Sequence, residues 1–91
     1  MKKLIVTPDV EFALTTLRAE EARQVRAWFD HLANWDDDAF VRVNSHALPD
    51  VAGVNMLRTS SDYRIFFSLE GDTITVLDVA TKQAILRTAG L

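Results

Sequence analysis

The sequence has 91 residues, the size of one small domain, so we predict a single domain over residues 1–91. Its globular composition contains no cysteine, which excludes disulfides and thiolate zinc sites. A net charge of −3 argues against non-specific nucleic-acid binding, because such binding depends on neutralising phosphates. Only a short apolar run follows the N-terminal lysines and no later run approaches a membrane span, so we expect a cytoplasmic protein without a signal peptide.

The N-terminal half predicts a strand and two helices. The β-branched run at residues 3–7 is typical of a strand, and Thr7-Pro8-Asp9 is typical of a helix start. The inner faces of the two helices are Val10, Leu14 and Leu17, then Val25, Trp28, Phe29 and Leu32. Because neither helix is long enough to be stable alone, we predict a helical hairpin over residues 9–32 that packs on another element.

The C-terminal half has the alternating pattern of strands. We predict three antiparallel strands, over residues 54–59, 63–69 and 73–79, and a short helix after Val79. The segment between the helices and these strands predicts a loop in which residues 36–38 cap a short helical turn. The switch from helical to strand period predicts an α+β fold, with an N-terminal strand and a helical hairpin packed on a small antiparallel sheet.

The predicted middle strand carries an arginine, Arg64, between two apolar residues. Its apolar residues alternate: Tyr63, Ile65, Phe67 and Leu69. Arg64 must therefore face away from the helices, on the opposite side of the strand. On that side Arg64 has two interpretations: it pairs with Glu70 or Asp78 across the sheet, or it binds a partner from outside the chain.

The other candidate residues point to no familiar chemistry. His31 and His46 have no second metal ligand at helical spacing, so we expect an exposed helix histidine and a loop histidine rather than a metal site. The glycines are isolated, so no phosphate-cradling loop exists and no cofactor is expected. Trp28, Phe29 and Trp35 are interpreted as core or core-edge residues.

The order of the predicted elements, together with "LRTSSDYRIFFSLEGDTITVLDVATKQ", resembles the RelE/ParE family, the toxins of bacterial type II toxin–antitoxin modules. The matching features are Leu57-Arg58 before a polar turn, Tyr63-Arg64-Ile65 after it, and a last strand followed by Lys82. The resemblance covers the whole chain in layout and is specific over residues 54–82.

The resemblance implies a function and a set of residues. RelE-type toxins are ribosome-dependent endoribonucleases, whose basic residues hold messenger RNA on the sheet and stabilise phosphate charge during 2′-hydroxyl attack. Carried onto this sequence, it implies Arg64 and Lys82 as catalytic residues and Arg58 and Arg87 as substrate-binding residues. It also implies two partners, messenger RNA on the ribosome and a cognate antitoxin protein.

The sequence departs from the ribonuclease pattern in two places. Val54 and Met56 stand where ribonuclease members carry lysines, and residues 83–91 contain no tyrosine or histidine for proton transfer. Since loss of a general acid or base costs roughly 10²–10⁴-fold, the pattern predicts weak cleavage.

Two alternative functions fit the same fold. A ParE-type toxin poisons DNA gyrase, and a non-toxic member of the fold would only bind an antitoxin. The apolar residues Val54, Met56 and Phe66 favour protein binding, and we expect an antitoxin to cover them together with the groove of the helical hairpin. The oligomeric state is left open.

Overall fold

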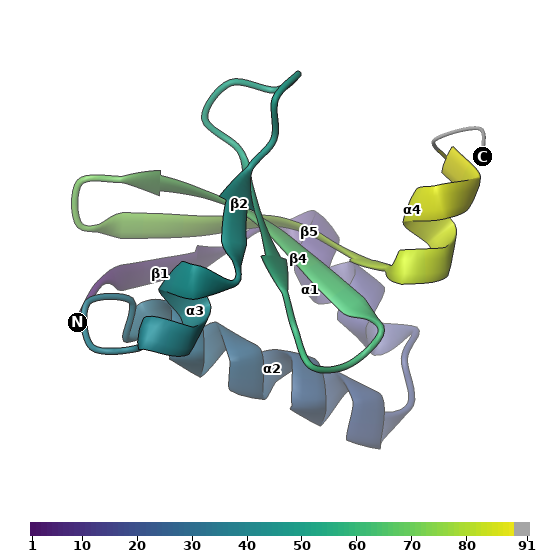
Figure 1. Ribbon diagram of the computed structural model, residues 1–91. Helices are drawn as coiled ribbons and strands as arrows, with labels where there is room; N and C mark the ends of the chain where they lie inside the picture. The colour runs from purple at the N-terminus through teal and green to yellow at the C-terminus, as the bar shows by residue number, and fades with distance from the viewer. Residues whose placement is uncertain (89–91) are drawn as a thin grey trace.

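A computed structural model describes residues 1–88 of the chain and the side chains of residues 1–85. In chain order the elements are β1 (Lys3–Val6), α1 (Pro8–Thr15), α2 (Ala19–Ala33), α3 (Ala39–Val43), β2 (Ser45–Ala47), β3 (Asn55–Arg58), β4 (Tyr63–Glu70), β5 (Thr73–Thr81) and α4 (Lys82–Thr88) (Figure 1). None of the helices in this part of the chain has the length and apolar character needed to cross a membrane.

The strands form one sheet in the order β1-β5-β4-β3-β2. The strands β3, β4 and β5 pair antiparallel, as predicted. The N-terminal strand β1 pairs in parallel with β5, so the sheet is mixed. This parallel pair follows from the helical hairpin, because parallel neighbours require a long crossover and α1 and α2 lie between β1 and the other strands in the chain. The predicted α+β class is confirmed.

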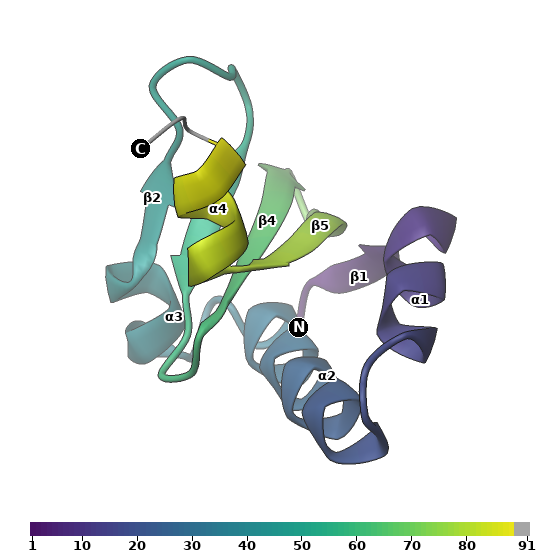
Figure 2. The same cartoon turned by 90° about the vertical axis from the view of Figure 1, so that its right-hand side faces the viewer.

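The helical hairpin covers one face of the sheet, as predicted, and α4 lies on the other side (Figure 2). Thr7 caps α1 by accepting a hydrogen bond from the Val10 N–H, and Pro8 occupies the first turn. The core between hairpin and sheet consists of Val10, Leu14, Val25, Phe29, Leu32, Val41, Leu57, Ile65, Phe67, Ile74 and Val76. Trp28 and Trp35 pack against this core from its edge, as expected.

One predicted loop and one predicted element boundary are wrong. Residues 45–47, predicted as loop, form β2 and pair antiparallel with β3. Three residues are too few to show a strand period, and the pairing partner in β3 decides their conformation. The strand β5 continues to Thr81, so the C-terminal helix begins at Lys82 rather than directly after Val79.

A bulge in β5 sets which residues reach each side of the sheet. Phe66 pairs with Asp78 and Phe67 pairs with Val76, which leaves Leu77 without a partner in the ladder. The extra residue lets Val76 and Val79 face the helices although they are three positions apart. It also brings Asp78 onto the same side as Phe66, facing away from the helices.

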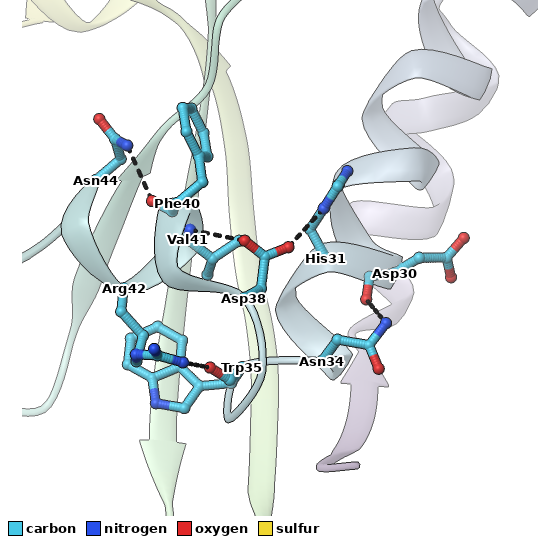
Figure 3. A network of polar contacts seen from close by, with 9 residues as sticks. All are labelled: Asp30, His31, Asn34, Trp35, Asp38, Phe40, Val41, Arg42 and Asn44. Carbon is cyan, nitrogen blue, oxygen red and sulfur yellow. Dashed lines mark hydrogen bonds and ion pairs between the residues drawn. The ribbon is translucent and has the colours of Figure 1, made fainter.

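A polar network joins α2 to α3 and so places β2 at the sheet edge (Figure 3). The His31 Nδ1 lies 2.7 Å from the Asp38 Oδ2, and the Asp38 Oδ1 accepts a hydrogen bond of 3.1 Å from the Val41 N–H. The hydrogen bond from His31, together with that from the Val41 backbone, lowers the pKa of Asp38. Trp28 and Phe40 support the same junction, with ring centroids 5.3 Å apart. The capping role predicted for residues 36–38 thus belongs to Asp38.

We predict that Asp38→Ala destabilises the protein by about 0.5–2 kcal/mol, the usual cost of losing an N-cap. Asp38→Asn keeps a capping oxygen but loses the charge beside His31, so its loss should be smaller. The exposed neighbour provides a control, because the Asp37 side chain forms no ion pair with the side chains of residues 1–85 and Asp37→Ala should be nearly neutral. Urea unfolding at pH 7 measures all three differences, and equal stability of Asp38→Ala and wild type would contradict the capping role.

The lowered pKa of Asp38 also predicts a pH dependence. A carboxyl group whose pKa is depressed by folding contributes stability above its unfolded-state pKa, and this contribution is lost as the pH falls through the folded-state pKa. The stability difference between wild type and Asp38→Asn should therefore shrink when unfolding is repeated below about pH 4. A difference that persists or grows in acid would show that the charge of Asp38 is not the cause.

Candidate functional site

Two arginines face each other directly on the side of the sheet that is turned away from α1 and α2, which we call the open face. Arg58 of β3 pairs with Arg64 of β4, and Leu57 pairs with Ile65 one position away. Leu57 and Ile65 are fully buried against the helices, so the two arginines project from the opposite face. The predicted orientation of Arg64 is confirmed.

The helix α4 completes a pocket over this arginine pair. The pocket has a volume of about 240 Å³ and is lined by Met56, Arg58, Arg64, Lys82 and Ile85. Lys82 and Ile85 come from α4, whereas the other three residues come from β3 and β4. The structure therefore brings together three of the four basic residues singled out in the sequence. The fourth, Arg87, has a side chain that lies outside the described residues.

The cations of this pocket have no carboxylate partner among the described residues. Arg58, Arg64 and Lys82 form no ion pair in that part of the chain, so the pairing of Arg64 with Glu70 or Asp78 does not occur there. The Arg64 guanidinium instead donates hydrogen bonds to the backbone carbonyls of Ser61, at 2.9 Å, and Tyr63, at 3.0 Å. These carbonyls fix the guanidinium without neutralising it, which leaves its charge available to an anion.

The turn between β3 and β4 holds Arg64 in place. Thr59 is 7% exposed, and its hydroxyl donates to the Tyr63 carbonyl at 2.6 Å while accepting from the Ser61 N–H at 3.2 Å. The Lys82 N–H donates to the Asp62 carbonyl at 2.7 Å, which joins the start of α4 to the same turn. Three elements of the pocket thus meet at one short segment, so the positions of Arg58, Arg64 and Lys82 are coupled through its backbone.

Tyr63 links this turn to the helical hairpin. Its hydroxyl donates a hydrogen bond of 2.7 Å to the Glu21 carboxylate of α2, and this bond, with partial burial, raises the pKa of Tyr63. Arg64 is the next residue along β4. The start of β4 is therefore anchored to the helices on one face while it presents a cation on the other.

A second, larger pocket adjoins the first and has a different character. It has a volume of about 640 Å³ and is lined by Leu48, Asp50, Val51, Phe66, Asp78, Ala80, Ala84 and Ile85. Ile85 borders both pockets, so α4 separates a basic site from a mostly apolar one with two carboxylates. Met56 and Phe66, expected to form an apolar surface, pair with each other on the open face. Val54 precedes β3, and its carbonyl accepts a hydrogen bond from the Leu48 N–H.

His46 is a residue that the sequence interpretation missed. The sequence predicts a loop here, but His46 lies in β2 directly opposite Met56 and therefore on the open face with Arg58 and Arg64. Its side chain is exposed and forms no hydrogen bond or ion pair with the side chains described, those of residues 1–85. No sequence signal marks this position, because β2 is only three residues long. Elsewhere in the described chain, no three His, Asp or Glu side chains are grouped as a metal site.

Comparison with known proteins places the fold but not the activity. No family model and no curated protein matches the sequence. The structure is similar to a chain in the crystal structure of the RelB-RelE antitoxin-toxin complex from Methanococcus jannaschii, with a TM-score of 0.68 and 13% sequence identity. The match covers 92% of this chain and 96% of that one. The RelE-like α+β fold predicted from the sequence is confirmed.

We predict that the opposed arginines lower the stability of the protein and that replacing one of them raises it. Like charges directly opposite on neighbouring strands are destabilising, and such cross-strand pairs are worth about 0.2–1 kcal/mol. We therefore expect Arg58→Gln to raise the free energy of unfolding by an amount in this range at low salt. The gain should shrink as salt rises, because the repulsion is screened.

Arg23→Gln provides the matched control for this measurement. Arg23 is an exposed arginine of α2 that forms no ion pair with the described residues, and it has no cation directly opposite on a strand. Urea unfolding of both variants at two salt concentrations separates the effects. A loss of stability in Arg58→Gln, or a gain independent of salt, would contradict repulsion between Arg58 and Arg64.

Proposed function

We propose that this chain is a toxin of a toxin–antitoxin pair, acting as a RelE-like endoribonuclease that binds messenger RNA on the ribosome. The observation that carries the proposal is the Arg58–Arg64 pair, extended by Lys82 into a pocket without a carboxylate partner in the described chain. Two like charges held face to face weaken the fold, and a bound anion relieves the repulsion. The fold similarity supports the same proposal.

The chemistry of the pocket fits a phosphodiester. A guanidinium presents a planar fork of donors to two phosphate oxygens and stays charged at any working pH. Two such groups, with an ammonium beside them, can stabilise the extra negative charge that develops on the phosphate oxygens during 2′-hydroxyl attack. Arg64 is already held by the carbonyls of Ser61 and Tyr63. Because its guanidinium need not reorganise during the reaction, it can stabilise the transition state more effectively than a mobile side chain.

With a net charge of −3, the protein depends on the ribosome to bring messenger RNA to the pocket. A protein of this charge gains no long-range attraction to free RNA, so local phosphate contacts must follow delivery of the messenger to the pocket. We therefore propose that cleavage occurs on the ribosome rather than on free messenger.

The second pocket supports a protein partner, which we propose is the cognate antitoxin. Its lining is largely apolar, with Leu48, Val51 and Phe66 exposed to a cavity of about 640 Å³. Apolar surface of this kind on a small protein usually marks a binding site, and an amphipathic segment would fill it. The carboxylates of Asp50 and Asp78 favour a segment that carries a basic side chain beside its apolar residues.

The same pocket favours a second candidate function, that of a protein-binding toxin directed at DNA gyrase or of a non-toxic antitoxin-binding module. In that case the partner would use the apolar pocket, and the arginine pair would have no catalytic role. The two candidates differ in whether RNA is cut, so they are separable by experiment.

Induced expression in bacteria tests the proposal. We expect the wild type to give growth arrest and weak cleavage, detected as new messenger 5′ ends. Arg64→Ala should lower cleavage by roughly 10²–10³-fold, the usual effect of removing one preorganised donor. Arg23→Ala, which removes an exposed arginine on the far side of the molecule, should leave cleavage unchanged. Arrest with DNA-damage signalling and no new 5′ ends would favour gyrase, and absence of arrest would favour the non-toxic module.

Co-expression tests the antitoxin partner. The small reading frame adjacent to this gene should give a complex that co-purifies with the chain. Val51→Asp should weaken the complex, because it places a charge in the apolar pocket at a residue that is already 48% exposed and whose replacement spares the core. Val43→Asp, at a residue of α3 that is 72% exposed, is the matched control and should have no effect. Equal weakening by both variants would contradict binding at this pocket.

A further inference from the structure

We propose that His46 is the general base that removes the proton from the attacking 2′-hydroxyl, an inference that rests on the proposed RNA cleavage. The C-terminal segment after Lys82 contains no histidine or tyrosine, so cleavage needs a proton acceptor from elsewhere in the chain. The open face supplies one on β2.

The strand register places His46 beside the phosphate pocket. His46 lies directly opposite Met56, and Arg58 follows Met56 by two positions on β3. Diagonal neighbours of this kind on one sheet face are about 7–8 Å apart. Arg58 in turn lies directly opposite Arg64. His46 therefore lies on the open face one strand away from the Arg58–Arg64 pair and diagonal to Arg58.

This diagonal arrangement fits the order of groups that the reaction needs. A phosphate bound between Arg58 and Arg64 would lie next to Met56, because Met56 lines the same pocket. A ribose attached to that phosphate and lying over Met56 carries its 2′-hydroxyl toward β2, where the next side chain on this face is His46. A base one strand away from the phosphate donors is thus placed on the nucleophile side.

His46 also has a free ring, unlike the other histidine of the chain. Among the described residues nothing bonds to His46, whereas the His31 Nδ1 is occupied by Asp38 at 2.7 Å. Imidazole exchanges a proton close to neutral pH, which neither arginine can do. His46 can therefore serve as the acceptor while the arginines hold the phosphate.

Besides His46 and the RNA, the cleavage reaction needs only water. The ring nitrogen of neutral His46 takes the 2′-hydroxyl proton as the 2′-oxygen forms a bond to phosphorus. The bond from phosphorus to the 5′-oxygen breaks, and this oxygen leaves with the electron pair and takes a proton from water. The hydroxide that remains receives the proton held by His46. The products are a 2′,3′-cyclic phosphate and a 5′-hydroxyl end.

Asp78 is the competing base on the same face and gives the discriminating variant. It lies opposite Phe66 on β5, on the other side of β4 from His46, and its Oδ1 accepts a hydrogen bond from the Val79 N–H at 2.8 Å. Its negative charge would also lie in the second pocket rather than among the cations. We expect Asp78→Asn to retain cleavage.

Purified ribosomes programmed with a short messenger test the proposal. Cleavage rate and binding to the programmed ribosome are measured separately for the wild type, His46→Gly, His46→Gln, Arg23→Ala and Asp78→Asn. We expect both His46 variants to lose roughly 10²–10⁴-fold in rate while binding within about twofold of wild type. Added imidazole should restore cleavage by His46→Gly but not by His46→Gln, in which the side chain fills the space. Arg23→Ala and Asp78→Asn should cleave like the wild type.

The outcomes separate this proposal from the one on which it rests. Wild-type rates in both His46 variants overturn the role of His46 and leave the endoribonuclease standing. Loss of binding together with cleavage, without rescue by imidazole, also overturns it and makes His46 a binding residue. A wild type that binds programmed ribosomes and leaves the messenger intact overturns both proposals.

Discussion

The structure depends on the register that sets Arg58 opposite Arg64. One position away, the same register sets Leu57 opposite Ile65, and these two residues are fully buried in the core. A slip of one residue would exchange the faces, placing the cations under the helices and the apolar side chains in water. Core packing therefore fixes the arginine pair, and the fold can hold two repelling charges together because the buried side of the ladder allows no alternative.

Other features of the chain support that arrangement. The bulge at Leu77 keeps Val76 and Val79 in the core, so β5 can follow β4 over its whole length. Thr59 closes the turn whose Ser61 and Tyr63 carbonyls accept hydrogen bonds from Arg64. The contact of Asp38 with His31 joins α2 to α3 just before β2. Each contact lies outside the basic pocket, but each determines where a strand of the open face lies.

Much of the fold followed from patterns in the sequence, because its strong signals are local. Helical spacing in residues 10–32, the Thr7-Pro8 cap and the alternation around Arg64 each depend on neighbours in the chain, and the structure agrees with all of them. The parallel pairing of β1 depends on residues some 70 positions away, and β2 exists because β3 offers a partner. Neither pairing produces a pattern in the sequence of the strand itself.

The candidate site divides in the same way. The orientation of Arg64 could be predicted from alternation within one strand. The family resemblance singled out Arg58, Arg64 and Lys82, and the structure shows that these three residues line one pocket. The position of His46 could not be predicted, because it depends on pairing of a segment with no period of its own. The apolar pocket was foreseen only in part, since Phe66 belongs to it whereas Leu48 and Val51 reach it from the loop before β3.

The central claim is that the open face binds RNA through its phosphates at the three cations. An NMR titration of the ¹⁵N-labelled protein with a short single-stranded RNA, at several salt concentrations, tests it most directly. The account predicts shifts confined to the backbone and side-chain signals around Arg58, Arg64 and Lys82. It also predicts a plot of log affinity against log salt with a slope of about −0.7, as expected for one neutralised phosphate on a single strand. Shifts centred on the helical hairpin, or an affinity that does not change with salt, would contradict it.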